Sequence, residues 1–358
     1  MNVVFLSPAF PPTAPAFCRA LARHGVTVLG IGDEPVAPDI AASWGLSSYV
    51  HEPGMADYAL LSRAVAELSS RFGTIARIDS NGEHWLEAEA RLRDDFGVWG
   101  LDGKTIAQQR SKLGMAQLFA SADIPHPPGA SCADLVTVRA FADTYGFPLV
   151  FKPDRGSGAV DTFRVDNEAE LAQAFTRSLQ GHLVQPFVEG DIVTYDGLCD
   201  REGRIVFCTG HAYDTGIMQV RLGHLDGYYY SLRELPPELE ALGRRAVAAF
   251  DVRERFFHLE FFQHSSGRLT ALEMNLRPPG GFTTDMMNAA CDIDVYELWA
   301  QVMTGQDLSQ LVVERRFHTA HAGRRSHRRY RLAEPELRRR LGDTLVSERA
   351  IPKAFADT

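Results

Sequence analysis

Short apolar runs alternate with helix-compatible stretches over the first hundred residues. This alternation is typical of a parallel α/β layer, so we expect a Rossmann-like domain over residues 1–100. The predicted strands are 2–6, 26–31 and 74–79, with helices near 15–24 and 83–95. The loop after the first strand, SPAFPP, is rich in proline, which has no backbone N–H to offer a phosphate. We therefore expect this domain to bind no dinucleotide.

A longer helical pattern follows, and a strand pattern comes after it. Residues 105–123 predict one helix that carries Lys112 midway, where a lysine taken alone faces solvent. Residues 147–165 predict strand, turn and strand, with Lys152 closing the first strand and Gly156-Ser157-Gly158 at the tip. Such a tip lets backbone N–H groups approach phosphates, although an ordinary Gly-Ser turn has the same sequence.

The most apolar stretch, residues 256–276, predicts two strands joined by the turn His264-Ser265-Ser266-Gly267. A loop symmetric about Ser265 and Ser266 pairs residue 263 with 268 and residue 260 with 271. Because side chains alternate along a strand, Glu260 then shares a face with Ala271, Glu273 and Asn275, and Glu273 is its diagonal neighbour. Two carboxylates and an amide oxygen on one face predict a site for Mg²⁺, or for Mn²⁺.

The alternative for this stretch is a surface hairpin with solvated acids. The flanking residues argue against it, because most are Phe or Leu and leave few positions for water. Carboxylates in such surroundings are costly to ionise unless a cation compensates. Arg277 follows at the same strand parity and offers a fixed positive charge to a phosphate. A helix predicted after Gly280 and Gly281, capped by Thr283 or Thr284, directs N–H groups toward the same anion.

A polar segment, DSNGEHW at 79–85, follows the third predicted strand, where open α/β sheets place their ligands. Glu83 within it could hold an ammonium group or orient a substrate. Helix capping explains the same residues, with Ser80 or Asn81 as the N-cap and Glu83 in the first turn. The sequence leaves both interpretations open.

The composition is that of an ordinary globular protein with room for two or three domains: 358 residues, 45% hydrophobic and 23% charged. A net charge of −9 with a pI near 5.7 disfavours nucleic acid as a partner. No apolar run approaches the roughly 18 residues of a membrane span, and the N-terminus lacks the basic region of a signal peptide. Five scattered cysteines predict reduced thiols, so we expect a cytoplasmic protein.

The last segment, residues 311–358, is rich in arginine and histidine. A solvated or self-association face is the simpler interpretation, and an anionic substrate or partner site is the alternative. The clustered side chains are Arg324, Arg325, Arg328 and Arg329 beside His318, His321 and His327. A homodimer is the expected oligomeric state, because closed two-fold assemblies are the commonest.

Taken in order, these motifs resemble the ATP-grasp superfamily, and the resemblance covers most of the chain. It implies an α/β and α+β architecture in which a Rossmann-like leading domain precedes a two-lobed ATP-grasp fold. The implied boundaries are 1–100 for the leading domain, 101–124 for a linker helix, 125–190 for the small lobe, 191–310 for the large lobe with the metal site, and 311–358 for the basic segment. The carrying motifs are SKLGMAQLFASADIPHPPG, FPLVFKPDRGSGAV, and HLEFF followed by LEMNLRPPGG.

The resemblance implies ATP and Mg²⁺ as cofactors and assigns roles to the motif residues. Lys112 and Lys152 become phosphate ligands, covered by the loop of Gly156, Ser157 and Gly158. Metal binding falls to Glu260, Glu273 and Asn275, while Arg277 and Lys152 act on the transferring phosphoryl group. VQPFVEG resembles the strand that binds adenine, and it contains Gln185, Pro186, Phe187 and Val188. Relatives usually hold the ribose with a Glu where this chain has Ile192, which leaves Asp191 or Glu189 for that role.

Within the superfamily the chain is most similar to carboxylate–amine ligases and to stand-alone proteins resembling half of the carbamoyl-phosphate synthetase large subunit. This implies an ADP-producing, C–N bond-forming ligase that works through an acyl phosphate. Its expected partners are a small-molecule carboxylate and an amine, with Glu83, Arg233, Gly280 and Gly281 as candidate contacts. Two alternatives stay open: a bicarbonate-activating enzyme of the biotin-carboxylase or carbamoyl-phosphate type, and a non-catalytic nucleotide-binding regulator.

Overall fold

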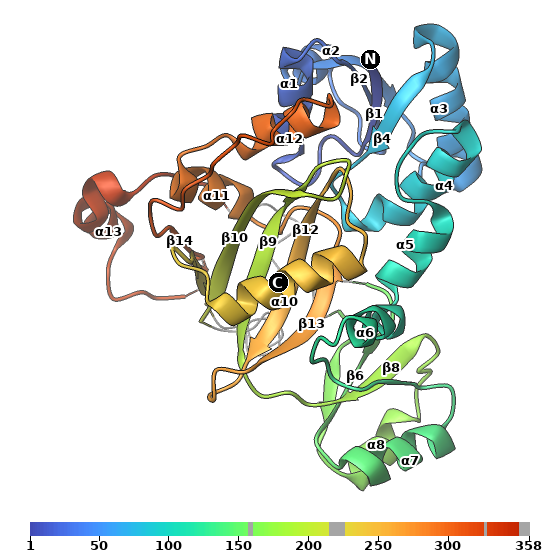
Figure 1. The fold of residues 1–358 in the computed structure, drawn as a ribbon, viewed down its shortest axis with the longest axis vertical. Helices are drawn as coiled ribbons and strands as arrows, with labels where there is room; N and C mark the ends of the chain where they lie inside the picture. The colour runs from blue at the N-terminus through green and yellow to red at the C-terminus, as the bar shows by residue number, and fades with distance from the viewer. Residues whose placement is uncertain (157–159, 215–225, 326–327, 351–358) are drawn as a thin grey trace.

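The computed structural model describes residues 1–156, 160–214, 226–325 and 328–350. Three sheets organise this part of the chain: a four-stranded parallel sheet, a four-stranded antiparallel sheet and a six-stranded antiparallel sheet. The expected α/β and α+β architecture is therefore confirmed. The large sheet lies in the middle of the molecule, with the leading domain at one end and the small lobe at the other (Figure 1).

The leading domain is a Rossmann-like layer whose sheet has the order β3-β2-β1-β4. Its strands are β1 (Asn2–Leu6), β2 (Thr27–Gly32), β3 (Leu46–His51) and β4 (Ile75–Asp79), and its helices are α1 (Ala14–Arg23), α2 (Pro38–Ser43), α3 (Tyr58–Phe72), the 3₁₀ turn η1 (Glu83–Trp85) and α4 (Leu86–Phe96). After Asn2, β1 is apolar because both faces of the sheet are covered, with Val3 and Phe5 toward α1 and Val4 and Leu6 toward α3. The three strands predicted here are confirmed to within one residue.

The linker is two helices, so the prediction of a single helix over 105–123 is wrong. α5 (Gly103–Arg110) and α6 (Lys112–Ser121) meet at Ser111, whose hydroxyl accepts a hydrogen bond from the Gly114 N–H at 3.1 Å. The two helices approach so closely that a Cβ on Gly114 would lie 2.2 Å from the carbonyl oxygen of Gln108. Lys112 therefore begins a helix instead of lying in the middle of one.

The small lobe is an antiparallel sheet with the order β5-β8-β6-β7. Its strands are β5 (Ala130–Ser131), β6 (Leu149–Pro153), β7 (Phe163–Val165) and β8 (His182–Pro186), and its helices are α7 (Leu135–Tyr145) and α8 (Glu168–Ala174). The lobe has an apolar core of its own, which includes Phe141, Phe151 and Leu171. α5 and α6 connect it to the leading domain along one side of the molecule (Figure 1).

The large lobe is built on an antiparallel sheet with the order β13-β12-β9-β10-β11-β14. Its strands are β9 (Asp191–Cys199), β10 (Ile205–Tyr213), β11 (Tyr228–Ser231), β12 (Arg255–Gln263), β13 (Leu269–Asn275) and β14 (Ala320–Ala322), and its helices are α10 (Pro237–Ala249), α11 (Thr283–Cys291) and α12 (Val295–Met303). β14 comes from the basic segment, which continues through α13 (Glu334–Leu341) and the 3₁₀ turn η2 (Gly342–Thr344).

The two faces of this large sheet differ in chemistry. α10 lies across one face (Figure 1), which contributes Tyr195, Phe257 and Phe261 to an apolar core. The opposite face is apolar at one end, where Phe256, Leu198 and Phe207 join another apolar core, and polar beyond it, because the strand register aligns polar side chains in rows. One row is Asn275, His258, Asp196 and Thr209, and the next is Glu273, Glu260, Thr194, His211 and Ser231. All of these except Glu273 are buried, so this polar face lies inside the molecule.

The register of the β12–β13 hairpin differs from the sequence prediction. Glu260 pairs directly with Glu273, whereas the prediction paired it with Ala271 and made Glu273 its diagonal neighbour. The turn is one residue longer than expected, since Gln263 pairs with Leu269. A bulge at Leu272 then shifts the pairing by one more residue. Because two shifts of one residue each add up to two, Glu260 and Glu273 still share a face of the sheet, as predicted. Ala271 lies on the opposite face.

A buried ionic network joins the leading domain to the large lobe. Glu89 on α4 accepts hydrogen bonds from Arg93 at 2.8 Å and from Arg255 of β12 at 3.0 Å. All three side chains are at most 5% exposed, so each charge depends on the others for compensation. α1 and α12 also pack together, with the rings of Phe17 and Trp299 edge to face at 5.2 Å. These contacts fix the leading domain against the large sheet.

Candidate active site

The two lysines predicted from the sequence lie beside the acidic hairpin. Lys112 is placed by the start of α6, where the Lys112 N–H donates to the Asp154 carbonyl at 3.0 Å and the Leu113 N–H donates to the Asp154 carboxylate at 3.0 Å. Its ammonium group donates to the Gly156 carbonyl at 2.9 Å and lies 3.8 Å from Oε2 of Glu273. The linker, the small lobe and the large lobe therefore meet at this lysine.

Lys152 is buried near the end of β6, at 7% exposure. Burial lowers the pKa of its ammonium group to about 8, and the positive charge of Lys112 acts in the same direction. The negative charges of Glu273 and Glu260 oppose this shift. Further negative charge, such as that of phosphate oxygens, would therefore stabilise the charged ammonium form of this buried lysine.

Glu260, Glu273 and Asn275 lie together, as the sequence predicted. Asn275 donates its side-chain N–H to Oε1 of Glu273 at 3.2 Å, and Oε1 of Glu260 lies 2.9 Å from Nε2 of His258. Each of the three side chains thus has one polar atom engaged in a hydrogen bond. The atoms that these hydrogen bonds leave over are Oε2 of Glu260, the amide oxygen of Asn275 and Oε2 of Glu273, which forms the 3.8 Å ion pair with Lys112.

These three oxygens are the ligand type that Mg²⁺ prefers, and Mg²⁺ usually completes its shell with water and nucleotide phosphates. Among the described residues, no group of three or more His, Cys, Asp and Glu side chains is arranged for a metal ion. A site with only two carboxylates fits a metal that is shared with a nucleotide better than one held by protein alone. The residues present therefore fit the Mg-nucleotide that the sequence predicted.

A chain of buried hydrogen bonds continues behind Glu260. Nδ1 of His258 lies 2.6 Å from Oδ1 of Asp196, and Oδ2 of Asp196 lies 2.7 Å from Nδ1 of His211. Burial lowers the pKa of the His258 imidazole, but the charges and hydrogen bonds of Asp196 and Glu260 outweigh it and raise that pKa to about 10. Burial raises the pKa of Asp196, and the charge of His258 with the hydrogen bonds of both histidines lowers it overall. Asp196 and His258 therefore form a buried ion pair, and the series of hydrogen bonds ends at Glu260.

Arg277 and Glu83 are brought together, although 194 residues separate them. Glu83 accepts hydrogen bonds through Oε2 from Nε and Nη2 of Arg277, at 3.2 and 3.0 Å. The capping alternative is not what the structure has, because the turn η1 begins after Gly82 with no side-chain cap. Tyr213 on the polar sheet face lies within the electrostatic reach of Arg277 and Glu260, and burial is the main cause of its raised pKa. Arg277 and Glu83 therefore face the same region as the acidic pair.

The predicted adenine segment comprises the end of β8 and the residues that lead into β9. Gln185 is buried, and Pro186, Phe187 and Val188 are half-buried. The Phe187 N–H donates to the Pro148 carbonyl at 2.9 Å, so this N–H is already used by the small lobe. Asp191 is exposed at the start of β9. The nucleotide roles of these residues stay predictions.

The remaining predicted site residues include the glycines that follow β6 and those that precede α11. Gly156 carries the carbonyl that binds Lys112, whereas Ser157 and Gly158 lie outside the described residues. Gly281 has a φ of +65° and lies so close to Tyr229 that an added Cβ would meet its hydroxyl at 3.3 Å. The exposed Gly280 precedes α11, whose N-cap is Phe282 with no side-chain cap, so the capping roles predicted for Thr283 and Thr284 are wrong.

The hydroxyl of Thr283 instead donates to the Gly280 carbonyl at 2.7 Å. Arg233 is exposed just beyond β11, and its carbonyl accepts a hydrogen bond from Arg315 at 3.0 Å. Within the described part of the chain, no hydrogen bond or ion pair joins Arg233 to the lysines or to the acidic hairpin. Its role in substrate binding stays a prediction.

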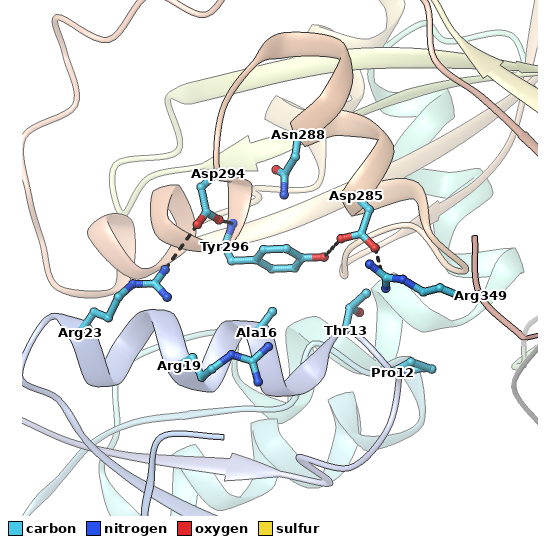
Figure 2. A pocket seen from close by; sticks show the side chains of 10 residues that line it. All are labelled: Pro12, Thr13, Ala16, Arg19, Arg23, Asp285, Asn288, Asp294, Tyr296 and Arg349. Atoms are coloured by element: carbon cyan, nitrogen blue, oxygen red, sulfur yellow. Dashed lines mark hydrogen bonds and ion pairs between the residues drawn. The ribbon is translucent and has the colours of Figure 1, made fainter. Parts of the chain in front are cut away.

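A separate cavity of about 340 Å³ lies between α1 and the helices α11 and α12 (Figure 2). Two ion pairs line it: Arg23 lies 3.4 Å from Asp294, and Arg349 lies 3.0 Å from Asp285. Tyr296 donates to Asp285 at 2.7 Å. None of the predicted site residues lines this cavity, so the geometry of the lysines and the acidic hairpin defines the candidate site.

His258, Asp196 and His211 were not predicted from the sequence. A usable signal was present for the first, because His258 has the same strand parity as Glu260 within a run that is otherwise Phe and Leu. Asp196 lies on β9, which pairs with β12, and His211 lies on β10, which pairs with β9. Their neighbourhood could not be derived without knowing the strand order.

Comparison with solved structures identifies the fold. The L-amino acid ligase from Bacillus licheniformis superposes with a TM-score of 0.70 at 17% sequence identity, covering 87% of this chain and 76% of that one. The N5-carboxyaminoimidazole synthetase from Staphylococcus aureus, solved with ADP, has a TM-score of 0.70 at 14% identity, covering 89% and 81%. The chain has the ATP-grasp fold. The lysines on α6 and β6 and the acids on β12 and β13 thus lie on different parts of an ATP-grasp fold.

Sequence comparison gives a more distant relationship. No known family's sequence profile matches this ATP-grasp chain. The L-arginine-specific L-amino acid ligase of Bacillus subtilis is 23% identical over 237 residues, covering 63% of this chain and 57% of that protein. The chain therefore spans less than two thirds of the length of this relative. Within the described residues, no helix combines the length and apolar character needed to cross a membrane.

Proposed function

We propose that this protein is an ATP-dependent carboxylate–amine ligase that forms an amide bond through an acyl phosphate and releases ADP. The observation that carries the proposal is the meeting of two lysines with two carboxylates. Lys112 and Lys152 come from the linker and the small lobe, and Glu260 and Glu273 come from the large lobe. Opposite charges collected from three parts of the chain suit a polyphosphate with its cation.

The two lysines hold the nucleotide phosphates. Lys152 is a buried point charge, so it interacts with an anion in a medium that screens little. Lys112 donates a hydrogen bond to the Gly156 carbonyl and therefore links the phosphate site to the segment that follows β6.

Mg²⁺, when bound, neutralises phosphate charge, and the oxygens free to hold it are on Glu260, Glu273 and Asn275. Arg277 adds a fixed positive charge that stabilises the transferring phosphoryl group. Glu83 orients Arg277, and its second oxygen is available to the ammonium group of an amino-acid substrate. No side-chain nucleophile takes part in this scheme.

The substrates are a small carboxylate and an amine, of the amino-acid or peptide type. Support for this class comes from two relatives described as L-amino acid ligases, one similar in sequence and one in structure. Gly280, Gly281 and the start of α11 lie next to Tyr229, and we assign the substrate carboxylate to this region. We also propose a homodimer in the cytoplasm, which light scattering and cell fractionation would test.

The test is ADP release with Mg-ATP against a matrix of amino acids and small carboxylates, each paired with amines. Turnover that requires one carboxylate and one amine is expected. Glu273→Gln should lower the rate about 100-fold or more, because it removes a charge that the metal requires. Glu67→Gln, an exposed acid on α3, is the matched control and should leave the rate unchanged.

Two other outcomes would overturn the proposal. ADP release with bicarbonate alone would indicate a bicarbonate-activating enzyme, the activity class of the biotin carboxylase domain from Hydrogenobacter thermophilus, which superposes with a TM-score of 0.70 at 16% identity. Nucleotide binding with no turnover over the whole matrix would indicate a regulator.

A further inference from the structure

We propose that Asp196 and His258 are positioning residues that fix Glu260 in the orientation needed to bind the metal ion. This inference rests on the proposed function, because it takes Glu260 as a metal ligand. It goes further by assigning a role to two buried residues of neighbouring strands that touch neither nucleotide nor substrate.

The geometry begins with the register of the large sheet. Asp196 on β9 is the direct cross-strand partner of His258 on β12, and Glu260 lies two residues beyond His258 on the same strand. All three side chains therefore extend from one face of the sheet. The two hydrogen-bond distances are 2.6 Å from Asp196 Oδ1 to His258 Nδ1 and 2.9 Å from His258 Nε2 to Glu260 Oε1.

The chemistry of the partners determines the direction of these bonds. Ionised carboxylates only accept hydrogen bonds, so an imidazole between two of them donates from both nitrogens. His258 therefore holds Oε1 of Glu260 and leaves Oε2 as the oxygen available to a cation. A carboxylate that is held in this way loses fewer rotamers when the metal binds than a free one would.

Asp196 is itself immobilised, which makes it a fixed anchor. Its Oδ2 accepts a hydrogen bond from the Thr194 hydroxyl at 2.6 Å and lies 2.7 Å from Nδ1 of His211. Asp196, Thr194 and His211 are completely buried, and His258 is 5% exposed. The anchor is therefore held on both oxygens and cannot rotate without breaking several bonds at once.

The competing explanation is that this network only stabilises the sheet. Charged groups this deeply buried are expensive to maintain, and apolar residues of similar size would pack the interior without that expense. A purely structural role does not explain why the chain of bonds ends on Glu260. The two explanations predict different metal affinities for a variant in which these hydrogen bonds are broken and the fold is kept.

The experiment measures Mn²⁺ binding to the protein–ADP complex by electron paramagnetic resonance, together with ADP affinity without metal. His258→Leu removes the hydrogen bonds to both carboxylates, and Asp196→Asn removes the negative charge that holds the protonated imidazole. Outer-shell partners of metal ligands typically change metal affinity by 10–100-fold, so we expect Mn²⁺ affinity to fall about tenfold or more in both variants. Metal-free ADP affinity should stay within about twofold, because neither residue contacts the nucleotide in the proposed site.

The matched control is His264→Gln. His264 lies in the turn of the same hairpin, and its Nε2 lies 2.9 Å from the Thr270 hydroxyl, outside the Asp196–His258–Glu260 hydrogen bonds. It should leave Mn²⁺ affinity unchanged. Circular dichroism identifies variants that keep the fold, and Asp196→Asn, which preserves shape, decides the question if His258→Leu does not fold.

The outcomes separate this inference from the proposed function. If the wild-type protein binds Mn²⁺ with ADP and Glu273→Gln weakens that binding, the metal site stands. Unchanged Mn²⁺ affinity in Asp196→Asn and His258→Leu would then overturn the positioning role alone. If the wild-type complex binds no Mn²⁺, the proposed metal site is wrong and the positioning role is wrong with it.

Discussion

Arg277 of the large lobe and Glu83 of the leading domain form a two-bond contact through a single oxygen, with Nε and Nη2 of Arg277 at 3.2 and 3.0 Å from Oε2 of Glu83. Both side chains are less than 20% exposed. Nη1 of Arg277 donates to the Pro278 carbonyl at 2.9 Å, so the guanidinium is held on both sides. A leading domain that we expect to bind no dinucleotide thus contributes a residue to the candidate site.

Replacing Glu83 should therefore affect catalysis through Arg277 and through the substrate amine. In Glu83→Gln the side chain keeps its size and loses its charge, and a hydrogen bond to a charged group is worth roughly 1.5–3 kcal/mol. We expect kcat/KM for the amino-acid substrate to fall at least about tenfold, with KM for ATP within about twofold. Steady-state kinetics with each substrate varied in turn measures both. Equal losses for ATP and amino acid would place Glu83 at the nucleotide instead.

Nucleotide binding should take up a proton at alkaline pH. The pKa of Lys152 is lowered to about 8, so its folded pKa lies below the unfolded value of 10.5. Between these values the unfolded chain binds more protons, and the contribution of Lys152 to the stability of the free protein rises with pH. Phosphates favour the charged ammonium form, so binding at pH 9 should protonate Lys152, and affinity should fall as pH rises above 8.

Calorimetric titration at pH 9 in two buffers with different ionisation enthalpies measures this proton uptake. Lys152→Met should abolish the uptake and weaken nucleotide binding. Lys104→Met removes an exposed lysine on α5 and should change neither. A buffer-independent enthalpy in the wild-type protein would mean that Lys152 does not meet the phosphates.

The bend between α5 and α6 should depend on Gly114. Gly114→Ala places a Cβ 2.2 Å from the Gln108 carbonyl oxygen, and overpacking of this kind typically costs about 1–3 kcal/mol. Relaxation by moving α6 would displace Lys112 at its first turn. We expect a lower melting temperature together with weaker nucleotide binding. Gly323→Ala, at a position with no heavy atom within 4 Å of the added Cβ, should change neither property.

Local pattern was sufficient for much of this fold. The apolar runs at β1, β2 and β4 predicted three of the four strands of the leading domain to within one residue, whereas α2 and α3 were not predicted. β3 was missed because its sequence, LSSYVH, is only half apolar and lies at the sheet edge. Edge strands are less buried, so their composition carries a weaker signal.

The prediction that Glu260 and Glu273 share a face of the sheet is correct partly by chance. Neither the length of the turn nor the bulge at Leu272 can be read from residue types, and each shifts the register by one residue. The shifts add to an even number, so Glu260 and Glu273 stay on one face. A single shift would have separated them.

The contacts between domains could not be derived from the sequence. Glu89 and Arg93 have the spacing of an ordinary surface ion pair on a helix, yet both are buried against Arg255. Similarly, the spacing of Ser111 and Gly114 is compatible with a cap, but an uninterrupted helical pattern around them concealed it. The burial of these charges and the break between the two helices depend on which surfaces pack together. A single amino-acid sequence does not specify which surfaces these are.

The central claim, that the two lysines and the acidic hairpin serve to activate a carboxylate, is tested most directly by isotope transfer. The carboxylate substrate found in the matrix assay is labelled with oxygen-18 in both carboxyl oxygens, and the released phosphate is analysed by mass spectrometry. An acyl phosphate loses its phosphate by attack of the amine at the acyl carbon, so the account predicts one labelled oxygen in each phosphate. Unlabelled phosphate released alongside amide product would contradict it.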